Sequence, residues 1–286
     1  MLARLRLTFE LVKFSHTVFA LPFAFLSAFI AARGVPSLRT TLLILVALVA
    51  ARTGAMAMNR LADRRFDALN PRTRNRPLVT GALGTGYVTA LCAASFAVLV
   101  AAAWALNPLA LALSPLAIAI LAGYSFTKRF TWASHLVLGV ALAGAPLGAW
   151  VAVAGKLDWA PVLLGTAVVL WVAGFDILYA CQDIEFDRRS GLHSIPARFG
   201  IERALAVSTA LHAVMAALLL LLPLLAPLGP FYIAGTLIVS FLLLYEHRLV
   251  NPKSLARLDQ AFFTVNGAVS IVLFVFGALD LLLFAR

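Results

Sequence analysis

The sequence has little charge and very little cysteine. Charged side chains make up 12% of its 286 residues, about half the share that is usual in a soluble domain. The two cysteines and five histidines show no metal-ligand spacing, which excludes a cysteine or histidine metal site and a disulfide framework. No small-residue cleavage pattern follows the first apolar run, so we expect no cleavable signal peptide. The chain is instead 63% hydrophobic with a mean hydropathy of +0.97, which predicts an integral membrane protein.

Acidic residues are also scarce relative to basic ones. The chain has 23 Lys and Arg against 12 Asp and Glu, a formal net charge of +11. In a soluble protein this balance would suggest nucleic acid as a partner. In a membrane protein, excess Lys and Arg reports topology and contact with anionic headgroups or substrates. We therefore expect membrane lipids, and no nucleic acid, as partners.

Nine apolar segments have about the length that crosses a bilayer. They cover residues 14–33, 40–58, 84–104, 107–124, 134–154, 160–180, 203–222, 229–247 and 261–283. If the spans alternate, the N-terminal segment and the most basic connections all lie on one side, which the positive-inside rule makes cytoplasmic. The expected fold is an all-α membrane protein, a single domain over residues 1–286, built as a bundle of nine transmembrane helices with a cytoplasmic N-terminus.

The first polar motif lies where the second span ends. Asn59, Asp63 and Asp67 are spaced i, i+4, i+8, so on a helix they share one face. An Asn-Pro pair at 70–71 is a helix-stop signal. Carboxylates one turn apart among arginines suit a divalent metal and an anionic phosphate. Six arginines lie near this stripe: Arg60, Arg64, Arg65, Arg72, Arg74 and Arg76.

A matching motif lies where the sixth span ends. Asp176, Asp183 and Asp187 are spaced i, i+7, i+11, again one helical face, and Tyr179 lies on it as well. This motif comes four spans after the first, which suggests a bundle with two similar halves.

These acidic residues also have purely structural explanations. Aspartates at the end of a span can neutralise nearby arginines, and Asp176 can hydrogen-bond to a neighbouring span. Glu185 falls off the polar face, and we expect it to pair with Arg188 or Arg189. Repetition of the motif favours a functional role, because charges at membrane depth cost about 2.5–3.5 kcal/mol each and tend to be functional.

The connection after the fourth span adds cations. Lys128 and Arg129 can serve as topology anchors or as diphosphate ligands, since an arginine fork pairs with phosphate and lysine supplies a point charge. Tyr124 lies one turn before Lys128 on the same face, and an interfacial aromatic is its alternative interpretation.

Two acidic clusters and several cations at one membrane face suit Mg²⁺ and a diphosphate. A diphosphate held in this way leaves more readily, and apolar surroundings keep water from the allylic cation that forms. A secondary transporter also has intramembrane charges and repeated halves. Its site, however, lies near the midplane rather than at one face.

Taken together, these motifs resemble those of a known family. N-R-x-x-D-x-x-x-D (59–67) and D-x-x-x-D (183–187) are similar to the two signature motifs of the UbiA superfamily of intramembrane prenyltransferases. Y-x-x-x-K (124–128) and N-P-R-T-x-x-R-P-L (70–78) are similar to it as well. The resemblance implies a nine-helix bundle with a lateral opening, Mg²⁺ dependence, and transfer of a polyprenyl group from a polyprenyl diphosphate to an aromatic acceptor.

The resemblance also implies roles for single residues. The implied Mg²⁺ ligands are Asp63, Asp67, Asp183 and Asp187, and the implied catalytic set adds Asp176 and Lys128. Asp176 or Asp183 would orient or deprotonate the acceptor. The implied substrate-binding residues are Asn59, Arg64, Arg72, Tyr124, Arg129, Tyr179 and Arg198.

Two further runs, at 14–24 and 191–200, look like the bacterial 4-hydroxybenzoate polyprenyltransferase group. This implies an inner-membrane enzyme of ubiquinone or menaquinone synthesis that acts on 4-hydroxybenzoate from the cytoplasmic side. Prenylation of 1,4-dihydroxy-6-naphthoate is the alternative, and a haem or chlorophyll precursor is another. Both aromatic acids carry a carboxylate, so a cation near the acceptor is expected, with His16, His193 and Arg198 as candidates.

Overall fold

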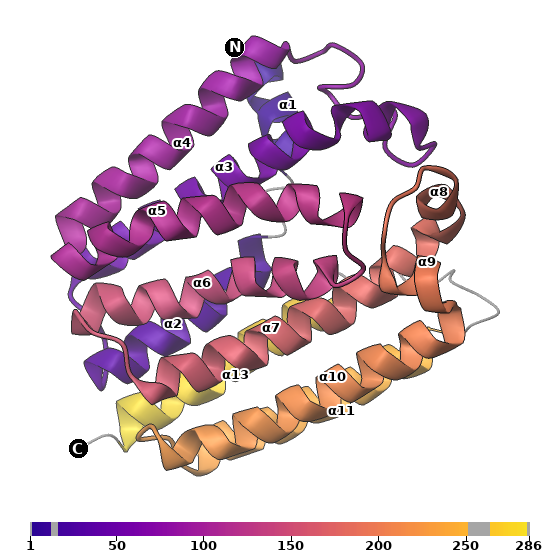
Figure 1. The fold of residues 1–286 in the computed structure, drawn as a ribbon. Helices are drawn as coiled ribbons and strands as arrows, with labels where there is room; N and C mark the ends of the chain where they lie inside the picture. The colour runs from indigo at the N-terminus through magenta and orange to yellow at the C-terminus, as the bar shows by residue number, and fades with distance from the viewer. Residues whose placement is uncertain (1, 13–16, 251–263, 285–286) are drawn as a thin grey trace.

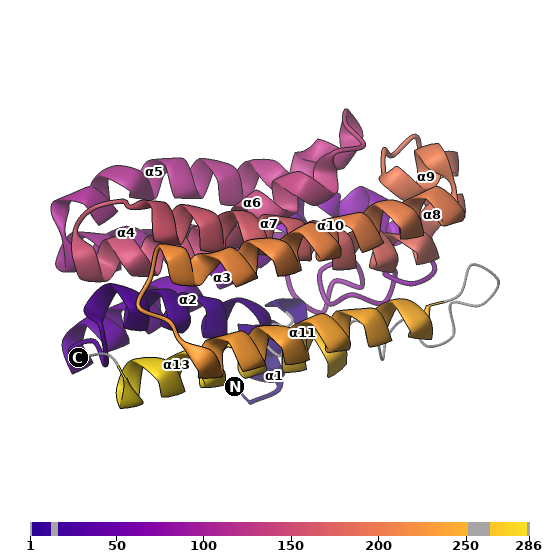
Figure 2. The same cartoon turned by 90° about the horizontal axis from the view of Figure 1, so that it is seen from below.

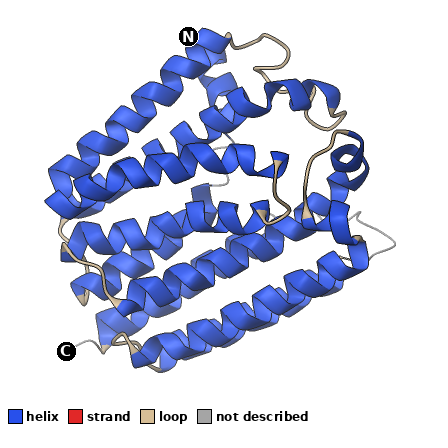
Figure 3. Cartoon of the chain, in the orientation of Figure 1, coloured by secondary structure: helices blue, strands red, loops and turns tan. Residues whose placement is uncertain are grey.

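The computed structural model describes residues 2–12, 17–250 and 264–284. Within these ranges every regular element is a helix and no strand occurs (Figure 3). The elements in chain order are α1 (Leu2–Val12), α2 (Thr17–Ala32), α3 (Leu38–Leu69), α4 (Thr85–Leu106), α5 (Pro108–Gly123), η2 (Tyr124–Arg129), α6 (Ser134–Ala154), α7 (Trp159–Ala180), η3 (Cys181–Asp183), α8 (Ile184–Arg189), α9 (Ile195–Phe199), α10 (Ile201–Leu221), η4 (Leu222–Leu224), α11 (Pro230–Leu249) and α13 (Asn266–Leu283).

Eight helices in the described ranges are long and apolar enough to cross a membrane, and each coincides with a predicted span. They are α3, α4, α5 continued by η2, α6, α7 continued by η3 and α8, α10 continued by η4, α11 and α13. The first predicted span, 14–33, overlaps α2, which is apolar over Phe19–Ala32 but shorter than the other eight. Residues 14–16 of that span, and residues 261–263 of the last one, lie outside the described ranges. The prediction of membrane-crossing helices is confirmed for eight of the nine segments.

The long helices lie alongside one another in a bundle with two distinct ends (Figure 1). The loop after α3, η2, α8 and α9 gather at one end, whereas the α4–α5, α6–α7 and α10–α11 connections lie at the other. The view from below shows α8 and α9 beside the end of α10 (Figure 2). Both aspartate motifs therefore lie at the same end of the bundle, as the spacing of the spans predicts.

The two helices that frame the candidate site begin and end where their sequences predict. Ser37 caps the start of α3, since its Oγ accepts a hydrogen bond from the Thr40 backbone N–H at 3.2 Å, and α3 ends at the Asn-Pro signal. Its 32 residues rise about 48 Å, more than the ~30 Å of a hydrocarbon core. The motif-bearing last turns of α3 therefore extend past the apolar part of the helix. Asn107 caps α5 by accepting from the Ala110 N–H at 2.9 Å, which fixes the tight α4–α5 connection.

The largest core cluster surrounds Trp171 of α7, which is fully buried. Phe23 lies against its ring at 4.9 Å between centroids, and its Nε1–H donates to Asn266 Oδ1 of α13 at 2.7 Å. On the opposite side of α7, Gly139 of α6 packs against the backbone of Val169 so closely that a Cβ there would lie 2.4 Å from the carbonyl oxygen. A clash of that size excludes a side chain at position 139, so the glycine allows α6 and α7 to pack closely beneath the second motif.

Candidate active site

An aspartate in the last turn of α3 pairs with an arginine in the loop after it. Asp67 is buried, with 7% of its surface exposed, and both of its carboxylate oxygens accept from Arg76 Nη1 at 2.7 Å. Its backbone carbonyl also accepts from Thr73 Oγ1 at 3.0 Å. These contacts fold the loop back over the first motif, and that loop then reaches the second motif.

Arg72 joins the first-motif loop to the second motif. Its Nε donates to Asp183 Oδ1 at 3.1 Å, its Nη2 pairs with Asp183 Oδ2, and its Nη1 donates to Tyr179 Oη at 2.7 Å. Asn70 Nδ2 donates to the same Asp183 carboxylate at 3.3 Å. Burial lowers the pKa of Arg72, but the Asp183 carboxylate and Tyr179 outweigh burial and raise the pKa above its usual value. The guanidinium therefore stays charged and links positions 111 residues apart.

Asp63 lies one turn before Asp67 on α3 and is only partly buried. One of its oxygens accepts from Asn59 Nδ2 at 2.9 Å, and the other lies 3.6 Å from Arg129 Nη2 of η2. Arg129 also donates to the Ala62 carbonyl at 2.7 Å, which ties η2 to α3. Asn59, Asp63 and Arg129, predicted as one site, thus lie in contact.

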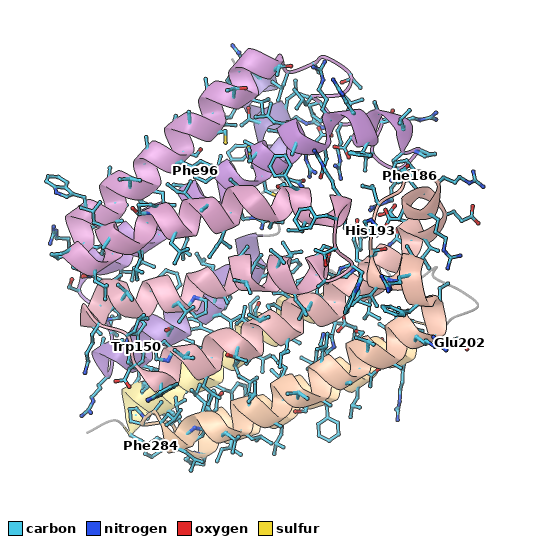
Figure 4. The ribbon with its side chains drawn as sticks, in the orientation of Figure 1. Phe96, Trp150, Phe186, His193, Glu202 and Phe284 are labelled. Carbon is cyan, nitrogen blue, oxygen red and sulfur yellow. The ribbon has the colours of Figure 1, made fainter. Side chains whose placement is uncertain are left out.

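Lys128 lies between the two motifs. Its charge interacts with the carboxylates of Asp176, Asp187 and Asp183, all from the α7–α8 segment, and with Asp63 of α3. Its backbone carbonyl accepts from the His193 N–H at 2.7 Å. His193 lies at the same end of the bundle as Phe186 of α8, away from Trp150 and Phe284 (Figure 4). The η2 turn therefore carries a cation into the space between two groups of acids.

Asp187 and Asp176 are both held by hydrogen bonds. Asp187 is 2% exposed and accepts from Ser194 Oγ at 2.8 Å. Asp176 Oδ2 lies 2.6 Å from His135 Nδ1 of α6, so the predicted bond from Asp176 to a neighbouring span is present. About 20% of the Asp176 side chain remains exposed, and its charge interacts with that of Lys128.

Three residues singled out in the sequence lie outside this arrangement. Arg64 is exposed and donates to Thr85 Oγ1 of α4 at 3.0 Å. Arg198 is exposed and stacks over the rings of Trp132 and Phe199 at 5.9 and 5.4 Å. His16 lies outside the described residues. Roles for Arg64 and Arg198 in substrate binding stay predictions without support from a contact to the two motifs.

Glu185 behaves as predicted for a residue off the polar face. It pairs with Arg189 at 3.5 Å, and both side chains are more than four-fifths exposed. The second motif therefore separates into two faces, with Asp183 and Asp187 turned inward and Glu185 turned out. This pair supplies a matched control for the aspartates.

The donor set fits Mg²⁺ together with a diphosphate, but not Mg²⁺ alone. In the described ranges no three His, Cys, Asp or Glu side chains are close enough together to hold a metal ion by themselves. Mg²⁺ does not need such a group, since it keeps waters and takes one or two carboxylates plus substrate phosphates. Hard carboxylate oxygens are available on both motifs, with Arg72, Arg76 and Lys128 beside them to meet the phosphates.

An apolar cavity begins beside this polar end. It has a volume of about 420 Å³ and runs between α3, α4, α5 and α6, from Tyr124 to Leu157 at the opposite end of the bundle. Its lining is almost entirely aliphatic. A cavity of this size is in the range of a ligand-binding pocket, and its shape suits a long hydrocarbon chain.

Arg52 is the one charged side chain among the described residues that line this cavity. Its Nε is buried without a hydrogen-bond partner, and its charge interacts with Tyr124. Desolvating a charge without a partner is costly, so an anionic ligand group is the natural partner. Arg52 is not among the predicted site residues, although it lies seven residues before Asn59 and eleven before Asp63 and so continues the same helical stripe.

Two other residues were noted only as part of an arginine-rich run. Arg76 proves to be the bidentate partner of Asp67. Arg60 is 5% exposed and donates to the Leu11 carbonyl of α1 and to Asn59 Oδ1. Nothing in the local spacing distinguishes these two from Arg64, because their partners come from other segments.

The fold and the site define an integral membrane protein that can hold an anionic headgroup at the mouth of an apolar cavity. The sequence profile described as UbiA prenyltransferase family matches residues 20–268. The chain belongs to the UbiA prenyltransferase family, and the resemblance noted in its motifs is confirmed.

Relatives and solved structures agree with this membership. The chain is 36% identical to the 4-hydroxybenzoate octaprenyltransferase of Azotobacter vinelandii, over 82% of this chain and 80% of that protein. It is 34% identical to the 4-hydroxybenzoate octaprenyltransferase of Nitrosospira multiformis, over 83% and 81%. A UbiA homolog from Aeropyrum pernix K1 superposes with a TM-score of 0.84 at 38% identity, covering 93% of this chain and 98% of that one. A UbiA homolog from Archaeoglobus fulgidus, bound to DMAPP and Mg²⁺, shares the fold with a TM-score of 0.72 at 24% identity, over 96% and 98%.

Proposed function

We propose that this protein transfers a polyprenyl group from a polyprenyl diphosphate to 4-hydroxybenzoate in quinone biosynthesis. The observation that carries the proposal is the convergence of both aspartate motifs and Lys128 beside an apolar cavity. Among the described residues, its lining includes one cation, the half-buried Arg52. The polar end suits a diphosphate, the aliphatic lining suits a prenyl chain, and the lone cation suits an aromatic carboxylate. The names of the relatives in Azotobacter and Nitrosospira support this acceptor.

The donor diphosphate lies between the two motifs in this proposal. Asp63, Asp67, Asp183 and Asp187 would hold it through Mg²⁺, which when bound neutralises the departing diphosphate. Lys128, Arg72 and Arg129 contact these carboxylates or lie beside them, so they can pair with phosphate oxygens instead. Asn59 orients Asp63, and Tyr179 orients Arg72. Such prearranged charges around a leaving group are usually the largest catalytic contribution.

The acceptor lies deeper, between Tyr124 and Arg52. Its carboxylate pairs with the Arg52 guanidinium, which places the hydroxyl-bearing side of the ring toward the donor. The new carbon–carbon bond forms ortho to the hydroxyl, the carbon–oxygen bond to diphosphate breaks, and the ring carbon loses its proton. Asp176 or Asp183 would take that proton. The aliphatic lining keeps water away from the allylic cation.

A prenylation assay on isolated membranes tests this function. Polyprenyl diphosphate would be supplied with 4-hydroxybenzoate or with 1,4-dihydroxy-6-naphthoate, and the lipid products would be extracted. We expect product from 4-hydroxybenzoate, loss of product with EDTA, and recovery with added Mg²⁺. Product from the naphthoate alone would assign the protein to menaquinone synthesis. Unchanged product in EDTA would remove Mg²⁺ from the proposal.

We further propose nine spans, with α2 as the ninth, in two similar halves that form a single domain. The N-terminus and the active site face the cytoplasm of a bacterial inner membrane. The basic loops at the motif-bearing end support this orientation under the positive-inside rule.

Labelling with a membrane-impermeant maleimide tests the orientation. Arg74→Cys lies in the exposed loop after α3, and Lys156→Cys lies in the exposed α6–α7 connection. We expect intact spheroplasts to label Lys156→Cys at once and Arg74→Cys only after permeabilisation. The native Cys92 and Cys181 are buried and give the background level. The reverse labelling pattern would invert the topology.

A further inference from the structure

His135, outside both aspartate motifs, occupies an unusual position beneath the candidate site. It is the second residue of α6 and has no exposed surface. Its Nδ1 lies 2.6 Å from Asp176 Oδ2 of α7, and its Nε2 lies 3.3 Å from the Ile195 backbone nitrogen at the start of α9. One imidazole ring thus joins three helices below the second motif.

The two contacts assign the tautomer of His135. A backbone N–H can only donate, so Ile195 donates to Nε2, and Nε2 carries no proton. The single proton of the neutral ring is therefore on Nδ1 and is donated to Asp176 Oδ2. A second proton on Nε2 would oppose the Ile195 N–H. His135 is therefore a fixed donor, with both ring nitrogens satisfied.

Asp176 connects this ring to the site. Four carboxylates interact with the Lys128 charge, and that of Asp176 interacts most strongly. The segment from His193 to Ile195 contacts both residues. The Ile195 N–H donates to His135, and the His193 N–H donates to the Lys128 carbonyl. His135 itself does not line the apolar cavity. Its influence on a substrate must therefore pass through Asp176 or through the segment around Ile195.

We infer that His135 is a positioning residue that fixes the Asp176 carboxylate near Lys128 and so keeps the Lys128 ammonium at the diphosphate site. The inference rests on the proposed function, in which Lys128 binds the donor diphosphate. The arrangement follows the general rule that a ligand-binding group is itself oriented by a buried partner. Loss of such a partner typically costs 10–100-fold in affinity or activity.

Binding of geranyl diphosphate with Mg²⁺ to the purified full-length protein in detergent tests the inference. We expect His135→Leu to weaken binding about 10–100-fold, by analogy with other orienting partners. His135→Asn keeps an amide N–H near the position of Nδ1 and should remain within about threefold of wild type. His135→Gln carries its amide near the position of Nε2 instead, and should bind as poorly as the leucine variant. The KM for 4-hydroxybenzoate should not change in any of them.

A double-mutant cycle with Asp176→Asn separates positioning from a general loss of structure. If His135 acts through Asp176, the His135→Leu/Asp176→Asn protein should bind no more weakly than the weaker of the two single variants. Losses that multiply, or wild-type binding by His135→Leu, would overturn the inference. Should the leucine variant fail to fold, the asparagine and glutamine variants decide, and equal binding by these two overturns it. A wild-type protein that fails to bind the diphosphate removes the proposed function, whereas one that binds it with no dependence on His135 removes only the inference.

Discussion

Replacing Asp183 by Asn is expected to lower the rate of prenyl transfer by at least about 100-fold while the protein still accumulates in membranes. The amide keeps the shape of the carboxylate, but it removes the charge that Arg72 and Asn70 surround and that the proposed Mg²⁺–diphosphate requires. A loss of 10²–10³ is typical when one prearranged electrostatic contact to a reacting group is removed. Asp63→Asn on the opposite motif should behave alike. The measurement is the initial rate on isolated membranes, normalised to the amount of protein.

Glu185→Gln is the matched control for this experiment. It changes the same kind of charge two residues away, in an exposed pair with Arg189 that points out of the site. Exposed ion pairs contribute little to stability, so the control should match wild type in both rate and abundance. Near-wild-type rates for Asp183→Asn would remove the diphosphate assignment. An equal loss in Glu185→Gln would show that overall charge, rather than the inward face, determines the rate.

Replacing Arg52 by Met is expected to raise the KM for 4-hydroxybenzoate by about 10–100-fold and to leave the KM for the prenyl donor unchanged. A hydrogen bond to a charged group contributes about 1.5–3 kcal/mol, and each 1.4 kcal/mol is a tenfold change in affinity. Methionine keeps much of the side-chain volume in the aliphatic lining. The donor KM should not change, because Arg52 is three turns of α3 away from Asp63. Steady-state kinetics with each substrate varied in turn measure the effect.

The methyl ester of 4-hydroxybenzoate distinguishes a carboxylate contact from a change of cavity shape. Wild type should discriminate strongly against the ester, and Arg52→Met should treat acid and ester alike. The variant should also be at least as heat-stable as wild type, since it removes a buried charge whose Nε has no partner. Discrimination that survives in Arg52→Met would place the acceptor carboxylate elsewhere.

The sequence predicts the parts of this protein that depend on local pattern. Apolar runs of about twenty residues locate eight spans, and the i, i+4 spacing of Asp63 and Asp67 puts them on one face of α3. The Asn-Pro pair predicts where α3 ends. The inward direction of Asp183 and the outward direction of Glu185 also follow from periodicity alone. Each of these features is determined by residues within a few turns of one helix.

The contacts across the bundle could not be predicted from one sequence. Arg72 and Asp183 are 111 positions apart, and His135 and Asp176 are 41 apart. Several arginines near the first motif look equivalent in sequence. Only the folded loop shows that Arg76 pairs with Asp67 while Arg64 turns toward α4. Arg52 differs from these residues, because its place on the helical stripe of Asn59 and Asp63 is a local signal in the sequence.

The length of α3 has a consequence for how the two substrates meet. Arg52, Asn59 and Asp63 lie on one unbroken helix with no proline inside it, and the eleven residues from Arg52 to Asp63 span about three turns, or roughly 16 Å. In the proposed function, this helix would hold the acceptor carboxylate and the departing diphosphate at a fixed distance and rotation from each other. Inserting one residue between them would rotate the carboxylates by about 100° relative to Arg52. Loops at the ends of the bundle can vary in length, whereas the number of residues between Arg52 and Asp63 cannot.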